Sequence, residues 1–156
     1  MRNKEKGFSL IELLIVVAII LIIAAIAIPN LLRSKMAANE SSAVGSMRTL
    51  NTASVSFSTT YGGYPPALSN LGPATPATST SADLIDSVLV TGTKSGYTFT
   101  YAPGASDANG NILAYTITAA PVTLGTTGQR GFYTDQSGVI RGDATGTASV
   151  SSTPIS

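Results

Sequence analysis

The sequence predicts an α+β protein in which one long N-terminal α-helix packs on a small antiparallel β-sheet of three or four strands. Three observations support this fold class. An apolar run near the N-terminus is long enough to cross a membrane, a stretch with helical periodicity follows it, and the C-terminal half alternates as strands do. A chain of 156 residues has room for one small domain attached to one long element, but not for two large domains.

The apolar run is the most informative segment of the chain. All residues of Leu13–Ile28 are apolar, and between Phe8 and Ile28 only Ser9 and Glu12 are polar. As a helix that rises about 1.5 Å per residue, residues 8–28 cover roughly 30 Å, the thickness of the hydrocarbon core of a bilayer. We therefore expect residues 8–28 to span a membrane.

The residues ahead of this run set its expected orientation. Residues 1–7 contain the basic residues Arg2, Lys4 and Lys6 against the single acid Glu5. Basic residues beside a membrane span remain in the cytoplasm, so the N-terminus is predicted to be cytoplasmic and the C-terminal part to lie across the membrane. Arg33 and Lys35 on the far side of the span weaken this bias.

The composition excludes most enzyme classes. The chain has no His and no Cys, which removes Ser/His/Asp and Cys/His nucleophiles, thiolate or imidazole metal sites, and disulfides. Nine basic residues against eight acidic ones leave no surplus of positive charge for a run of phosphates. We expect no enzyme activity, no catalytic residue, no metal site, no cofactor and no specific nucleic-acid partner.

Glu12 distinguishes the possible functions of the apolar segment. A secretory signal peptide could be cut near Ala25–Ala27, but its apolar region is shorter and contains no acid. A plain membrane anchor has no use for Glu12, because a carboxylate deep in a spanning helix costs on the order of 2.5 to 3.5 kcal/mol. Glu12 therefore needs a partner.

The motif around Glu12 resembles a known family. Lys6-Gly7-Phe8-Ser9-Leu10-Ile11-Glu12-Leu13, followed by the apolar run and Pro29, is similar to the N-terminus of type IV prepilins, a family that includes the pseudopilins of type II secretion. The strict resemblance covers about residues 4–30. It implies the type IV pilin fold, with residues 1–7 as a leader and residues 8–60 as one helix.

The resemblance also implies how the chain is processed and assembled. A prepilin peptidase would cut between Gly7 and Phe8 and then methylate the new amine of Phe8. Glu12 would neutralise the Phe8 amine of a neighbouring copy as the chains form a helical homopolymer. The implied partners are further copies of the chain, the prepilin peptidase and N-methyltransferase, an assembly platform in the inner membrane, and membrane lipid before assembly.

Three functions remain open at this point. The first is a structural subunit of a type IV pilus-like filament, which lies in the bacterial inner membrane before assembly and in a periplasmic or cell-surface filament afterwards. The second is a type II secretion pseudopilin. The major pseudopilins typically carry a cluster of calcium-binding acids in their last loop, and Asp135 and Asp143 are too sparse for such a cluster. The third is a membrane-tethered periplasmic binding module that never polymerises.

Residues 29–60 are predicted to continue the helix in amphipathic form. The apolar face is expected to contain Ala43, Met47, Leu50, Ser54, Phe57 and Tyr61, with Arg33, Lys35, Asn39, Glu40 and Arg48 on other faces. Pro29 lacks the N–H that would bond the carbonyl of Ala25, so we expect a kink or short break over about Ala24 to Pro29. Relatives commonly carry Gly where this chain has Leu21, which is expected to stay helical.

Residues 61–156 are predicted to form the globular part. The helix should stop at Tyr61-Gly62, and residues 67–80 should form an exposed loop followed by a short helix from about Ala82 to Leu89. Strands are expected around Tyr97–Tyr101, Leu113–Ile117, Gly131–Thr134 and Val139–Arg141. Ala144–Ser156 is expected to be frayed.

Two signals in this part are weak. Asp107, Asn109 and Asn111 begin like a calcium loop, but the position of Gly110 and Thr118 at the twelfth place favour a simple turn. Gly125, Gly128 and Gly131 lack the context of a nucleotide site and are interpreted as flexible loop residues.

Overall fold

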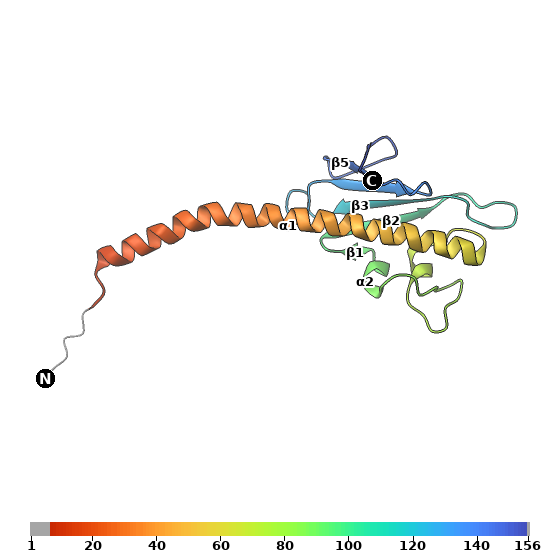
Figure 1. Cartoon of the computed structure of the whole chain (residues 1–156), viewed down its shortest axis with the longest axis horizontal. Helices are drawn as coiled ribbons and strands as arrows, with labels where there is room; N and C mark the ends of the chain where they lie inside the picture. The colour runs from red at the N-terminus through yellow and green to blue at the C-terminus, as the bar shows by residue number, and fades with distance from the viewer. Residues whose placement is uncertain (1–6, 156) are drawn as a thin grey trace. The chain divides into compact units, whose positions relative to one another are not determined.

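The computed structural model describes residues 7–155 and divides the chain into two units, Met1–Lys35 and Met36–Ser156. One helix, α1 (Leu10–Tyr61, 52 residues), belongs to both units (Figure 1). The basic residues Arg2, Lys4 and Lys6 of the expected leader lie outside the described residues.

The first unit is the apolar part of α1. Its side chains are almost all exposed, from Val17 at 44% to Leu10 at 75% among the large apolar residues. An 18-residue window of this helix has a mean hydropathy of 3.3, so α1 is long and apolar enough to cross a membrane. This finding agrees with the expected span at residues 8–28.

Pro29 does not interrupt α1 in the single chain. The helix is continuous from Leu10 to Tyr61, so Leu21 is helical as expected and α1 has no break between Ala24 and Pro29. The alternative expectation, a kink over these residues, stays a prediction. Proline removes only one backbone hydrogen bond here, and the alanines before it favour the helix. The side chain of Asn30 adds a bond, because its Nδ2 donates to the carbonyl of Ile26 at 3.0 Å.

In the second unit α1 buries one face against the sheet (Figure 1). The buried residues of this helix are Glu40, Ala43, Ser46, Met47, Leu50, Ala53, Ser54 and Phe57. The predicted period is confirmed, with one correction. Glu40 was expected outside the apolar face of the helix but is 8% exposed and lies against the sheet. The helix ends at Tyr61 as predicted, and Gly62 follows it with a positive φ of 86° and donates its N–H to the carbonyl of Ser58.

The sheet has six antiparallel strands, more than the three or four expected, and each strand pairs with the next one along the chain. The strands are β1 (Thr93–Lys94), β2 (Tyr97–Pro103), β3 (Tyr115–Pro121), β4 (Gly131–Asp135), β5 (Arg141–Asp143) and β6 (Thr153–Pro154). Alternate residues of the central strands face α1, and the register pairs Phe99 with Ala119 and Tyr101 with Ile117. The α+β fold class is confirmed.

Two strand predictions need correction. Leu113 lies outside β3 and is 62% exposed, so only Tyr115 and Ile117 of the predicted triplet are strand residues. The fourth predicted strand begins at Arg141 rather than at Val139.

The C-terminal segment is ordered by pairing. Residues 144–155 were expected to be frayed, but β6 pairs with β5, and the N–H of Ile155 donates to the carbonyl of Ile140 at 2.8 Å. The side chain of Arg141 adds a bond from Nη1 to the carbonyl of Ser152. These contacts hold the segment in a chain that has no disulfide to do so.

The connecting segment between α1 and the sheet also differs from the prediction. The short helix predicted from Ala82 to Leu89 is reduced to α2 (Ser87–Val90), which is capped by Asp86. The Asp86 Oδ1 accepts the N–H of Leu89 at 2.7 Å. A single 3₁₀ turn, η1 (Leu68–Leu71), lies within the expected loop.

The two weak sequence signals have structural explanations. The Asp107 Oδ1 accepts the N–H groups of Asn109 and Asn111, both at 2.8 Å, which confirms the turn. Flexibility is the wrong explanation for two glycines of the triplet. A side chain at Gly128 would overlap the ring of Tyr97, and one at Gly131 would overlap the backbone of Gly146.

Candidate processing and assembly site

Gly7 and Phe8 precede the first turn of α1 and are fully accessible. Both are outside regular secondary structure, and Phe8 is 80% exposed. A side chain added at Gly7 would meet no atom within 4 Å, so nothing in the folded chain requires glycine there. The role of Gly7 in processing therefore stays a prediction that the packing of the described residues does not test.

Ser9 and Glu12 close the N-terminal end of α1. The N–H of Ser9 donates to Glu12 Oε2 at 2.9 Å, and the N–H of Leu13 donates to the carbonyl of Ser9 at 3.2 Å. Since α1 begins at Leu10, Glu12 is its third residue and reaches back to the residue before the helix, as in half of a capping box. A carboxylate at this end also interacts favourably with the helix dipole.

This cap gives Glu12 a function that our sequence analysis missed. The signal was present as a Ser followed three residues later by Glu, directly before an apolar run. Oε2 is occupied by the chain's own Ser9, whereas Oε1 accepts no hydrogen bond from any residue between Gly7 and Ile155. Glu12 can therefore cap its own helix through Oε2 and still present Oε1 to a cationic group.

The predicted site residues fall into two groups. Gly7, Phe8 and Glu12 come together at the N-terminal end of α1, where a peptide cut after Gly7 would place a new amine next to the cap. Pro29 lies far along the same helix and takes no part in this end. Their roles in processing and assembly stay predictions.

A second polar cluster joins α1 to the sheet. Glu40 Oε1 accepts the N–H groups of Gln129 and Arg130 at 2.9 and 3.1 Å, and Oε2 accepts Arg130 Nε at 2.8 Å. Burial raises the pKa of Glu40, but these hydrogen bonds and the positive charge of Arg130 outweigh burial, so its pKa is below the ordinary value. Glu40 is therefore ionised at neutral pH and fastens the helix to the start of β4.

The described residues offer little for acid–base or metal chemistry. Between Gly7 and Ile155 there is no group of three or more Asp or Glu side chains that could hold a metal ion. Burial raises the pKa of Tyr97 and of Tyr115 to about 12, and it raises the pKa of Tyr101 as well. These hydroxyls stay protonated at neutral pH and serve as hydrogen-bond donors, as Tyr97 does to the carbonyl of Arg130 at 2.7 Å.

Comparison with known proteins assigns the N-terminal segment. Residues 2–28 match the model of the prokaryotic N-terminal methylation motif. This match includes the first part of the exposed apolar helix α1, and it confirms over this segment the resemblance to type IV prepilins that is seen in the sequence.

The particular relatives are major pilins. The type IV major pilin protein PilA of Myxococcus xanthus is 50% identical over 54 residues, which are 35% of this chain and 24% of the relative. The type IV wide pilus major component PilA4 of Thermus thermophilus is 65% identical over 40 residues, which are 26% of this chain and 30% of the relative. The chain thus matches less than a third of each relative's length. No solved structure matches the chain.

Proposed function

We propose that the chain is the major structural subunit of a type IV pilus-like filament rather than an enzyme. One observation carries the proposal: the N-terminal methylation motif includes the first part of a helix whose apolar side chains are exposed in the described part of the chain. The relatives with the same segment are described as major components of type IV pili. An apolar helix of this length has to be covered by lipid, by other copies of the chain, or by each in turn.

Burial of the apolar side chains favours lipid before assembly and packing against other copies afterwards. Large apolar residues such as Leu10, Ile19 and Leu32 are about half exposed or more, and burying each contributes about 1.5 to 3 kcal/mol. Lipid supplies this burial while the chain is a monomer in the inner membrane, with its N-terminus in the cytoplasm. Packing of these helices against one another supplies it in the filament.

Glu12 would select the arrangement of neighbouring helices. After cleavage the amine of Phe8 is a cation at the helix end, and the free Oε1 of Glu12 is a suitable acceptor on the adjacent copy. An ion pair in low dielectric fixes register even where its net stabilisation is small. The inner-membrane assembly platform and the prepilin peptidase are the other partners in this proposal.

The processing step is tested on the mature N-terminus. Intact mass and N-terminal peptide analysis of sheared filaments should give a chain that begins at N-methylated Phe8. Gly7→Val should accumulate as the uncut precursor, because a branched side chain blocks entry of an extended backbone into a narrow protease cleft. Gly45→Val is a control, since Gly45 also has open space around it but lies away from the junction. A mature chain that starts at Ile28 or retains Met1 would contradict the proposal.

The assembly step is tested at Glu12 with two variants. Glu12→Ala should be processed normally but weaken the association of copies about tenfold or more, which corresponds to about 1.4 kcal/mol, and so lower the filament yield. Glu12→Gln keeps an oxygen that can accept the N–H of Ser9 and removes only the charge. We expect it to assemble as poorly as Glu12→Ala. If Glu12→Gln assembles normally, the helix cap and not the ion pair is what matters.

The same measurements separate the alternative functions. A membrane-tethered binding module would remain monomeric with an intact Gly7–Phe8 bond. A secretion pseudopilin would be processed, and its filaments would require a secretion operon instead of pilus genes. The similarity to major pilins favours the pilus.

A further inference from the structure

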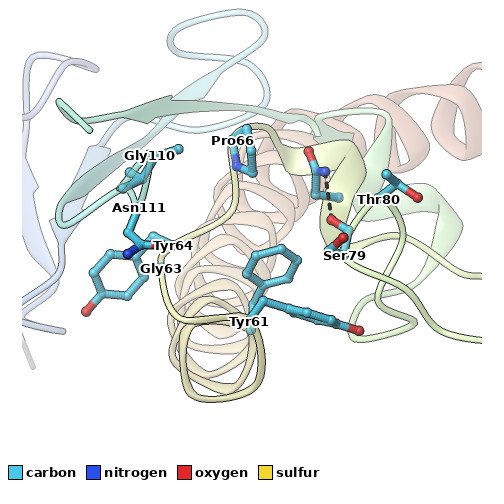
Figure 2. Close-up of a pocket in the computed structure, with 11 residues that line it drawn as sticks. Tyr61, Gly63, Tyr64, Pro66, Ser79, Thr80, Gly110 and Asn111 are labelled. Carbon is cyan, nitrogen blue, oxygen red and sulfur yellow. Dashed lines mark hydrogen bonds between the residues drawn. The ribbon is translucent and has the colours of Figure 1, made fainter. Parts of the chain in front are cut away.

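A cavity of about 300 Å³ lies just beyond the C-terminal end of α1, inside the second unit (Figure 2). Its lining includes Tyr61, Pro66, Asn70, Ser79, Thr80 and Asn111. In Figure 2 Tyr61 lies on the same side as Ser79 and Thr80, and Gly110 and Asn111 lie on the other side of the segment through Gly63 and Pro66. The cavity is therefore formed by residues 57–66, by residues 70–80 that follow them, and by residues 110–112 from a distant part of the sequence.

One wall is fixed by backbone contacts. The N–H of Tyr64 donates to the carbonyl of Ile112, and the Tyr101 hydroxyl donates to the carbonyl of Pro65, both at 2.8 Å. Gly63 lies so close to this loop that a side chain there would come within 2.9 Å of the backbone nitrogen of Ile112. This wall is consequently held in place before any ligand arrives.

The opposite wall is a small turn. Thr78 and Ser81 exchange backbone hydrogen bonds of 2.9 and 3.1 Å, and Asn70 Nδ2 donates to the carbonyl of Ser79 at 3.1 Å (dashed in Figure 2). The ring of Tyr61 packs on the ring of Phe57, and the two ring centroids are 4.7 Å apart. Both walls are thus pre-organised, which reduces the entropic cost of binding.

Several functional groups in the cavity have no hydrogen-bond partner among residues 7–155. The hydroxyls of Tyr61 and Ser79 and the amide oxygens of Asn70 and Asn111 make no hydrogen bond to any described residue. None of the lining residues is charged. The site therefore offers rings together with neutral donors and acceptors, and no group that would hold an ion.

We propose that this cavity binds a neutral sugar unit of a glycan. A sugar ring has an apolar C–H face, which suits the rings of Tyr61 and Pro66, and a rim of hydroxyls, which suits the free amide oxygens and hydroxyls. An anionic or cationic ligand would have to lose its hydration without gaining an opposite charge. The inference goes beyond the proposed filament function and does not depend on it.

The test uses the full chain as a monomer in zwitterionic micelles, because a glycoside detergent would itself compete. Saturation-transfer difference NMR with cellobiose, maltose and diacetylchitobiose should detect binding of at least one of these neutral disaccharides. Sialyllactose, which carries a carboxylate, should bind more weakly than the best neutral probe. The proposal would be overturned if none of the neutral sugars received saturation from the protein, or if sialyllactose bound more tightly than all of them.

Matched variants locate the site. Tyr61→Leu should weaken binding about tenfold, whereas Tyr133→Leu, at a similarly half-buried tyrosine outside this cavity, should leave it unchanged. Ser79→Ala removes one hydroxyl from an exposed turn and should weaken binding severalfold without affecting the fold. Equal affinity of the three variants would show that the sugar binds elsewhere and would overturn the assignment. Filament yield is expected to be unaffected by Ser79→Ala, so a failure here is distinct from a failure of the filament proposal.

Discussion

The two halves of α1 use apolar residues in opposite ways. In the first half Leu21 is 63% exposed and its neighbours are similar, whereas in the second half Leu50 is fully buried against the sheet. Both halves are parts of one continuous helix. The second half is therefore stabilised by packing within the chain, whereas the first half depends on lipid or another molecule. Helical structure alone does not show which surface a helix packs on.

The solvent face of the second half is also distinctive. It is rich in Ser and Thr, which are mediocre helix formers, yet the hydroxyls of Thr49, Thr52, Thr59 and Thr60 each donate to the carbonyl four residues earlier. This face needs no contact with lipid. The chemical difference between the halves thus follows the expected boundary between membrane and water.

The largest test of this comparison is a pair of matched leucine substitutions. Leu50→Ala should lower the free energy of unfolding of the second unit by about 3 kcal/mol, because it leaves a cavity in the core. Leu21→Ala should leave that free energy unchanged. Denaturant titration of the full chain in micelles, followed by near-ultraviolet circular dichroism of the tyrosines, measures both. A similar loss in both variants would mean that the two halves are not energetically distinct.

Gly128→Ala tests how closely the loop before β4 approaches the core. The added methyl group would overlap the Tyr97 ring and disturb its bond to the carbonyl of Arg130, so we expect a loss of about 2 kcal/mol. The same titration measures it. Gly138→Ala is not a suitable control because Gly138 has a positive φ of 75°. An unchanged midpoint would show that the loop is mobile, as the sequence had suggested.

Glu40 provides a test that depends on pH. Its folded pKa is lower than its unfolded pKa, so its contribution is complete above the ordinary pKa of a glutamate and is lost as the pH falls through the folded value. Glu40→Gln should lower the free energy of unfolding by about 1.5 kcal/mol at neutral pH and remove part of the acid dependence. Unfolding titrations at pH 7 and at pH 3 check this. The difference between wild type and variant should shrink at the lower pH.

Gly45→Ala should change the free energy of unfolding least, and it should raise it where the other substitutions lower it. The position is in the second half of α1 with no atom near an added methyl group, so alanine should raise the free energy of unfolding by up to about 1 kcal/mol. The midpoint of thermal unfolding in micelles should rise accordingly. A decrease would indicate that this face of the helix is in contact with something in the folded protein.

Much of the fold follows from patterns that are readable in the sequence. The end of α1 at Tyr61 and the strands β2 and β4 were predicted because periodicity and turn residues agree there. β1 and β6 were missed because a strand of two residues is too short to show alternation. β6 also lies in a Ser- and Thr-rich tail that reads as disordered, and it is ordered only by pairing with β5.

At the candidate site, too, the local motif was predicted from the sequence but contacts that form only on folding were missed. The motif at Gly7, Phe8 and Glu12 is local and was recognised from the sequence, although the cap between Ser9 and Glu12 was not. Glu40 was placed outside the apolar face of the helix because a charged residue is seldom part of such a face. Its partners, at Gln129 and Arg130, are about ninety positions away, and only the folded chain reveals them.

The short strands β1 and β6 form the two edges of the sheet, and this has a consequence for a crowded membrane. Chains that are anchored at one end and concentrated in a plane readily join sheet to sheet if a long edge strand is exposed. Here each edge is two residues long; one contains Lys94, whose ammonium pairs with Asp86, and the other contains Pro154, which has no N–H to donate. Disordered aggregation through the sheets is thereby discouraged, and in the proposed filament association would be left to the helices.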